Sequence, residues 1–138
     1  MIGTLLDQLR HAGRRRTWDP DLAAGRRGED LAHRYLRREG YTIVARNYRL
    51  SSGEAEADLI ARQGEDLVIV EVKTRASSEY GPPERAVSPE KQRHLIRVAR
   101  EYARKTDMPW ERVRFDVVSV LMREPPEITL LRSAFRTP

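Results

Sequence analysis

The sequence contains no cysteine and few histidines, which removes several kinds of site. Without cysteine there are no disulfides, thiolate zinc sites or cysteine nucleophiles. The 3 histidines, His11, His33 and His94, lie far apart along the chain, so we do not expect a histidine-rich metal site. No apolar run approaches the ~20 residues that cross a bilayer, and the N-terminal leucine cluster is too short for a secretory signal. We therefore expect a cytoplasmic protein without a membrane partner.

The chain is rich in charged residues. Of its 138 residues 34% are charged and 39% are hydrophobic, and the formal net charge is +5. This length suits one domain with a single core. A basic domain attracts polyanions, of which nucleic acid is the commonest in a cytoplasm. A merely soluble basic surface explains the charge equally well, so charge alone does not decide the partner.

The pattern of apolar residues predicts an α/β domain in the order α-β-β-β-α-β-β, with a mixed central sheet of about five strands flanked by helices. Residues 1–20 form a basic N-terminal arm, and residues 21–138 form the domain. Ser88 and Pro89 are a helix-opening pair, a serine N-cap followed by proline. The predicted elements are a helix over 21–39, strands over 41–48, 56–62 and 67–74, a helix over 89–105, and strands over 115–121 and 128–135.

The second and third strands form a hairpin that carries the chemistry. If Gly64 and Glu65 are at the centre of the turn, Asp58 lies across from Glu71. Side chains alternate along a strand, so Lys73 shares the face of Glu71 while the neighbouring valines point into a dry layer on the other face. Two acids and a lysine are thereby predicted to meet at the end of a buried strand.

Two carboxylates placed opposite each other repel and weaken a hairpin. A bound divalent cation, Mg²⁺ or Mn²⁺, would remove the repulsion between Asp58 and Glu71, since hard cations choose oxygen ligands. Such a cation polarises a phosphodiester and lowers the pKa of an attacking water, and Lys73 would orient that water or stabilise the transition state. The alternative is a surface ion pair of little energetic value. The flanking valines favour the functional interpretation.

A further acid, Glu29, lies in the first helix beside the buried stripe. A carboxylate turned toward the sheet is unfavourable unless a partner receives it. Gly25 and Gly28 let the backbone come close to another element. Taken alone, Glu29 is as easily explained by an arginine partner. Beside the hairpin acids it is a candidate for an extra metal or water ligand.

Asp58 and the run Glu71-Val72-Lys73 resemble the signature of the PD-(D/E)xK nuclease superfamily, which includes archaeal Holliday junction resolvases. More narrowly, residues 21–121 resemble the uncharacterised bacterial YraN-like family, which is itself grouped with endonucleases. The matching blocks are Gly25-Arg26-Arg27-Gly28-Glu29, Arg46-Asn47-Tyr48, Glu56-Ala57-Asp58-Leu59-Ile60-Ala61, Val70-Glu71-Val72-Lys73-Thr74-Arg75 and Arg114-Phe115-Asp116-Val117-Val118.

The resemblance implies a restriction-endonuclease-like core with catalytic residues Glu29, Asp58, Glu71 and Lys73. It places the metal on Asp58 and Glu71. The family pattern Gly-Glu-x-Asp is altered here, because Ala55 precedes Glu56 and Gly53-Glu54 stands two residues earlier. The extra acid of the site is therefore either Glu56 or Glu54.

Two groups of arginines are candidates for binding nucleic acid. Arginines on the second helix recur at spacings of three and four and make one stripe, which suits a phosphate track or a solvated face equally well. A second group lies near the hairpin and is better placed to hold the sugar-phosphate backbone of a nucleic acid beside the metal. No residue pattern reads a base sequence, so we expect recognition of shape. The stripe is Arg93, Arg97, Arg100 and Arg104, and the second group is Arg46, Arg49 and Arg75.

Two functions are consistent with these residues. The first is a Mg²⁺-dependent endonuclease acting on DNA, including branched or damaged DNA. The second is a non-catalytic nucleic-acid-binding module that retains the nuclease fold. A third alternative, a basic domain that binds only proteins, would explain the positive net charge but would leave the two acids of the hairpin unexplained. All four polar residues that the resemblance requires, Glu29, Asp58, Glu71 and Lys73, are present, which favours the enzyme. The sequence does not decide between a monomer and a homodimer.

Overall fold

The computed structural model describes residues 20–76 and 87–137 of the chain. The predicted N-terminal arm lies outside this part except for Pro20, so it stays a prediction. In the described part, two long helices and five strands follow one another in the predicted order, and a short 3₁₀ helix, η3 (Trp110–Arg112), precedes the fourth strand. No helix of the described residues has the length and apolar character needed to span a membrane.

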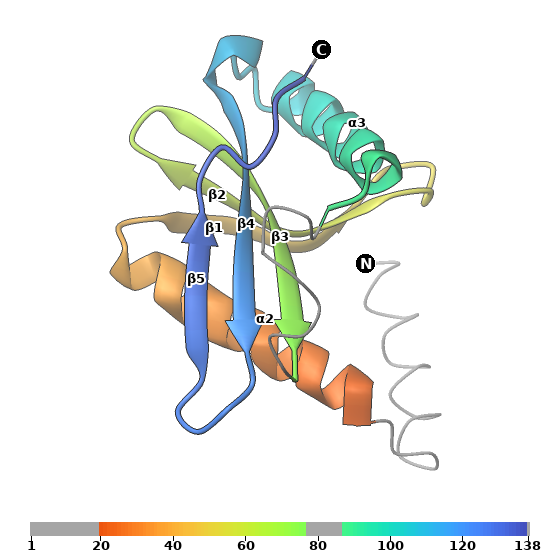
Figure 1. Ribbon diagram of the computed structural model, residues 1–138. Coiled ribbons are helices and arrows are strands. Elements are labelled where there is room, and N and C mark those ends of the chain that lie inside the picture. Colours follow the sequence, from red (N-terminus) through yellow and green to blue (C-terminus); the bar gives the residue numbers. More distant parts are fainter. Residues whose placement is uncertain (1–19, 77–86, 138) are drawn as a thin grey trace.

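The strands form one mixed sheet, which confirms the predicted α/β class (Figure 1). Their order in the sheet is the order in the chain, and every neighbouring pair is antiparallel except β3 and β4, which are parallel. The last strand ends earlier than predicted, because the backbone of Ser133 has a positive φ of 50° and cannot continue the ladder. The strands are β1 (Thr42–Arg49), β2 (Glu56–Gln63), β3 (Asp66–Arg75), β4 (Val113–Leu121) and β5 (Glu127–Leu131).

Helix α2 (Pro20–Arg38) packs on one face of the sheet through an apolar stripe. Ala32 and Leu36, four residues apart, are fully buried against strand residues. The helix ends in a Schellman motif, in which Tyr41 N donates to Leu36 O at 2.9 Å and Gly40 N donates to Arg37 O at 3.2 Å. Gly40 has a φ of +92°, a conformation that favours glycine, so this residue sets the start of β1.

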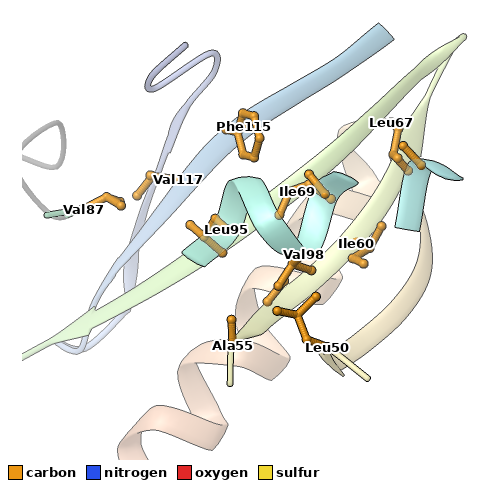
Figure 2. Close-up of a cluster of buried hydrophobic side chains, with 13 residues drawn as sticks. Leu50, Ala55, Ile60, Leu67, Ile69, Val87, Leu95, Val98, Phe115 and Val117 are labelled. Atoms are coloured by element: carbon orange, nitrogen blue, oxygen red, sulfur yellow. The ribbon is translucent and has the colours of Figure 1, made fainter. Parts of the chain in front are cut away.

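Helix α3 (Pro89–Lys105) crosses the opposite face and connects β3 to β4 (Figure 1). It begins as predicted, since the Ser88 hydroxyl accepts a hydrogen bond from Lys91 N at 3.1 Å and proline occupies the first helical position. Its buried side chains include Leu95 and Val98, which pack with Ile60 and Ile69 of the sheet (Figure 2). Both faces of the sheet are therefore covered, and the central strands β2, β3 and β4 are largely buried between the helices.

The hairpin of β2 and β3 has the predicted register. Gln63 pairs with Asp66 across a turn in which Gly64 has a φ of +57°, and the ladder continues to the pair Leu59 and Val70. Side chains then alternate along β3: Val68 and Val70 are fully buried beneath α2, and Leu67 and Ile69 belong to the α3 face. This register brings the end of β3, with its acid and its lysine, to the first turn of α3.

Candidate functional site

The hairpin forks at the site. Regular pairing of β2 and β3 ends at Leu59 and Val70, one residue before Asp58. Beyond this point the Asp58 carboxylate takes a place in the ladder, since its Oδ2 accepts a hydrogen bond from Val72 N at 2.8 Å. The fork holds the Asp58 carboxylate between the two strands and beside the next acid on β3.

Glu71 is the buried centre of the site. Only 4% of this residue is exposed, and its Oε1 has no hydrogen-bond partner within the described residues. Two lysines approach its two oxygens from different elements. Lys73 Nζ of β3 lies 3.5 Å from Oε2, and Lys91 Nζ of α3 lies 3.8 Å from Oε1. The predicted neighbours Asp58, Glu71 and Lys73 thus come together, and a second lysine joins them.

Glu29 reaches the same place from α2. The preceding Gly28 packs so closely on β3 that a β-carbon there would lie 3.0 Å from Cβ of Thr74, with the Thr74 hydroxyl closer still. The absence of a side chain at Gly28 lets the helix approach the strand end. It brings the Glu29 carboxylate near enough to Asp58 for their charges to interact. The expected close approach of this helix is therefore observed at Gly28, whereas a β-carbon at Gly25 would meet nothing within 4 Å.

Burial and mutual repulsion shift the proton equilibria of two acids. Burial, followed by the negative charge of Asp58, raises the pKa of Glu71 to about 8, against the opposing pull of Lys91 and then Lys73. Burial, followed again by Asp58, raises the pKa of Glu29 to about 7, while Arg46 pulls it down. The negative charge of Asp58 therefore makes ionisation of both Glu29 and Glu71 harder.

Asn47 links the acids of α2 and β2. Its backbone has a positive φ of 50°, and asparagine tolerates this conformation better than most residues do. With the amide nitrogen turned toward the acids, it donates to Glu29 Oε1 at 3.1 Å and to Glu56 Oε1 at 3.2 Å. Glu54 instead pairs with Arg97 on α3 at 2.6 Å and is exposed. Of the two candidates for the extra acid, Glu56 is the one that lies beside the site.

Two of the three arginines predicted near the hairpin, Arg46 and Arg49, pair with acids around the site. Arg46 Nη2 lies 2.9 Å from Asp30 and 3.8 Å from Glu29, and Arg49 Nη2 lies 2.9 Å from Glu56. Arg75 is partly buried at the end of β3. These side chains offset the negative charge of the site as well as offering positive charge beside it.

The predicted stripe on α3 is exposed along its whole length. Two of its members have partners within the protein: Arg97 is paired with Glu54 at 2.6 Å, and the guanidinium of Arg100 lies 4.4 Å from the centre of the Trp110 ring. Arg93 and Arg104, at the two ends of the stripe, are exposed. The stripe begins beside Lys91 and so runs away from the acid site along the helix.

Asp116 on β4 belongs to a separate and saturated network. It is 1% exposed and accepts hydrogen bonds from Tyr41 Oη at 2.8 Å, Arg114 Nε at 3.0 Å and Ser133 N at 3.0 Å. These contacts tie the start of β1, β4 and the segment after β5 together. These contacts support a structural role for Asp116.

The donor set at the fork fits a hard cation. Among the residues that the structure describes, no group of three or more histidine, cysteine, aspartate or glutamate side chains is arranged to hold a metal ion. Asp58 and Glu71 are a pair of oxygen donors, and Glu71 contributes a buried Oε1 without a hydrogen bond. Mg²⁺ is commonly bound by one or two carboxylates and keeps several waters. Asp58 and Glu71 are therefore the residues that would hold such a cation.

Two residues of the site were missed by the sequence analysis. Lys91 lies 20 positions after Glu71 in the sequence and belongs to a different element, so no local spacing connects the two. Asn47 stands inside a block that the family resemblance had already singled out, yet its role as a bridge between two acids depends on the packing of α2 on β1. Only a three-dimensional arrangement reveals both contacts.

Together these features define a class: a small α/β protein with a mixed sheet, a forked hairpin and a cluster of carboxylates that surrounds one buried glutamate and is flanked by lysines. The family model described as "Uncharacterised protein family UPF0102" matches residues 28–120, and the chain belongs to this family. This confirms the narrower of the two resemblances, to the YraN-like proteins.

Relatives of this chain occur in distant bacteria. A UPF0102 protein of Solibacter usitatus is 55% identical over 111 residues, covering 80% of this chain and 84% of the relative. One of Rhodococcus opacus is 47% identical over 117 residues, covering 83% of this chain and 98% of the relative. Among solved structures, Pyrococcus furiosus SfsA in complex with Ca²⁺ aligns with a TM-score of 0.38 at 19% identity. That alignment covers 81% of this chain and 63% of SfsA, and the likeness is too low to assign anything to this chain.

Proposed function

We propose that this protein is a metal-dependent endonuclease that hydrolyses phosphodiester bonds in DNA, with branched or damaged DNA among its substrates. The observation that carries the proposal is Glu71. It is a buried carboxylate with a raised pKa, held beside Asp58 and faced by lysines from two elements. The resemblance to PD-(D/E)xK nucleases supports the same assignment of these residues.

A structural role explains this cluster poorly. A buried acid next to another acid destabilises the folded chain, because ionisation of each must overcome both burial and repulsion. The two lysines relieve this only in part, since the pKa of Glu71 still reaches about 8. Asp116 shows the contrast, because its hydrogen bonds to Tyr41, Arg114 and Ser133 satisfy it without any external group. An arrangement that is unfavourable for folding and suited to a ligand points to function.

The chemistry follows from the positions of the side chains. Asp58 and Glu71 would hold Mg²⁺ or Mn²⁺, which supplies a Lewis acid for the phosphoryl oxygens and a more acidic bound water. Lys73 keeps about a third of its side chain exposed, 36%, so its ammonium can leave Glu71 for the phosphate and stabilise the charge that develops there. Glu29, with a pKa of about 7, is suited to accept a proton near neutral pH.

Positive charge along α3 supports nucleic acid as the substrate. The exposed arginines of this helix lead from the site along one surface, and contacts of this kind release counterions from phosphates without reading bases. Recognition would then depend on the shape of the DNA, which accords with branched or damaged substrates.

Cleavage assays test the proposal directly. Branched, single-stranded and duplex DNA of matched sequence would be incubated with Mg²⁺, Mn²⁺ or EDTA, using wild type, Asp58→Asn and Arg38→Ala. Arg38 is exposed in the last turn of α2, on the face of the sheet opposite α3, and serves as a charge control. We expect metal-dependent cleavage by wild type and the control, and none by Asp58→Asn. Salt-sensitive binding without cleavage would instead establish the non-catalytic nucleic-acid-binding module.

A further inference from the structure

Lys91 is the least explained residue of the site. It lies in the first turn of α3, and its Nζ is 3.8 Å from Glu71 Oε1 and 3.5 Å from the carbonyl oxygen of Glu56. Both distances are long for a charge-assisted hydrogen bond, which is typically about 2.7–2.9 Å. The ammonium therefore stands near the buried oxygen without binding it firmly.

Helix stability does not account for this lysine. The N-terminus of a helix carries partial positive charge, so a cation in the first turn is unfavourable there and an acid is favourable. Glu90 in the same turn is the expected kind of residue. Lys91 stands against this preference, and its side chain turns toward Glu71. The position is better explained by the acid than by the helix.

Lys91 Nζ lies beside Glu71 Oε1, the buried oxygen that has no hydrogen-bond partner within the described residues, whereas Lys73 Nζ lies beside Oε2. About a third of the Lys91 side chain, 32%, is nevertheless exposed. A lysine ammonium sits on a flexible stem and can turn to a new partner with little change in the backbone. Lys91 thus combines a position beside the buried oxygen of Glu71 with access to solvent.

We propose that Lys91 is a displaceable counter-ion of Glu71: it neutralises the acid until a divalent cation binds, and it then turns to a phosphate of the nucleic acid. This inference rests on the proposed function, because it needs a cation at Asp58 and Glu71. Metal and Lys91 compete for one carboxylate, so binding of the metal releases a cation for the substrate. Metal binding and nucleic-acid binding then favour each other, and by linkage the effect is reciprocal.

Two binding measurements, one of Ca²⁺ and one of DNA, test this proposal without requiring cleavage. Ca²⁺, another cation that prefers oxygen ligands, would be titrated into wild type and Lys91→Met, with binding followed by calorimetry. Loss of the competing ammonium should raise Ca²⁺ affinity about fivefold or more, at the lower end of ordinary couplings between sites. A fluorescent branched DNA would then be titrated with and without Ca²⁺. The gain in DNA affinity that Ca²⁺ gives wild type should shrink in Lys91→Met and return in part in Lys91→Arg.

Lys105→Met is the matched control, because it removes the same charge from the last turn of the same helix. It should change neither the Ca²⁺ affinity nor the gain in DNA affinity. A purely structural Lys91 would alter thermal unfolding and the Ca²⁺ affinity, yet it would leave the gain in DNA affinity intact. Lys91→Gln serves as a second variant if Lys91→Met fails to fold.

The outcomes are distinguishable. If Lys91→Met and Lys105→Met behave alike, or if the gain in DNA affinity is unchanged without Lys91, the inference is wrong while the proposed function stands. If wild type binds no Ca²⁺, Mg²⁺ or Mn²⁺ at all, the proposed function fails first and the role of Lys91 fails with it.

Discussion

The carboxylate of Asp58 replaces a backbone carbonyl as the acceptor for Val72 N, at 2.8 Å, where β2 and β3 separate. One side chain therefore does two things: it completes the hydrogen bonding of β3, and it presents negative charge to Glu71. The backbone donor of Val72 keeps the Asp58 carboxylate in place even though the neighbouring acid repels it. This double role makes two substitutions at Asp58 informative in different ways.

We expect Asp58→Asn and Asp58→Ala to differ in stability without metal. Asparagine keeps an oxygen that can accept from Val72 N and removes one charge, so this variant should be as stable as wild type or slightly more stable. Alanine leaves the Val72 donor unsatisfied, at a cost of about 1–3 kcal/mol. Both should lose stabilisation by Mg²⁺, which acts by mass action on the folded state. Urea unfolding with and without Mg²⁺ checks this, and a metal response retained by Asp58→Asn would show that the pair is structural.

The register that creates the site was predictable from local sequence. A turn at Gly64 and alternating side chains fix which residues of β2 and β3 meet, and the structure confirms the pairing as far as Leu59 and Val70. The fork at Asp58 was not predictable, because it depends on a side chain that replaces a backbone partner. The same limit applies to Lys91, whose contact with Glu71 depends on how α3 packs across the sheet.

The predicted arginine groups show a second limit. Sequence spacing placed the stripe of α3 on one surface, and the structure shows it exposed. Spacing could not show that Arg97 is paired with Glu54 or that Arg46 contacts Asp30 and Glu29, because these acids come from other elements. The ion pairs of long charged side chains depend on how the helices and strands pack together, so they cannot be predicted from local sequence spacing.

Stability should fall as pH rises from mildly acidic to mildly alkaline conditions in the absence of metal. The pKa of Glu29 is raised from 4.5 to about 7 and that of Glu71 from 4.5 to about 8. At pH values above 4.5 and below the raised pKa of each acid, the folded state keeps a proton that the unfolded state has released. The free energy of unfolding therefore decreases as pH rises through this interval. The contribution is fully present below the unfolded pKa and is lost as pH passes the folded values.

Urea unfolding of wild type and Glu71→Gln between about pH 5 and about pH 9 measures this effect. The difference between the two proteins isolates Glu71 from other titrating groups, and wild type should lose stability relative to the variant as pH rises. Saturating Mg²⁺ should reduce that loss, because it stabilises the ionised acid. A difference that stays constant across the range would contradict the raised pKa.

The two glycines of α2 form a matched pair for testing how Glu29 reaches the site. At Gly25 a new β-carbon meets nothing, so Gly25→Ala should stabilise the helix by up to about 1 kcal/mol. At Gly28 the β-carbon would press on Thr74, so Gly28→Ala should destabilise the fold by about 1–3 kcal/mol, as overpacking does. It should also weaken metal-dependent cleavage by moving the helix and Glu29. A Thr74→Ala change should restore part of the stability in Gly28→Ala and none in Gly25→Ala.

Salt dependence of DNA binding should distinguish the members of the α3 stripe. Each arginine contact with a phosphate contributes about 0.9 to the slope of log affinity against log salt. Replacing Arg93 and Arg104 together with alanine should therefore lower the slope by up to about 2. Replacing Arg97 and Arg100 should lower it less, because Arg97 is paired with an acid at 2.6 Å and Arg100 stacks on a ring at 4.4 Å, so each must leave a partner to reach phosphate. Fluorescence anisotropy at several salt concentrations gives the slopes, with Arg38→Ala, at the exposed end of α2, as the control for net charge. Equal slopes for all these proteins would place the DNA on another surface and leave the stripe as a solvated face.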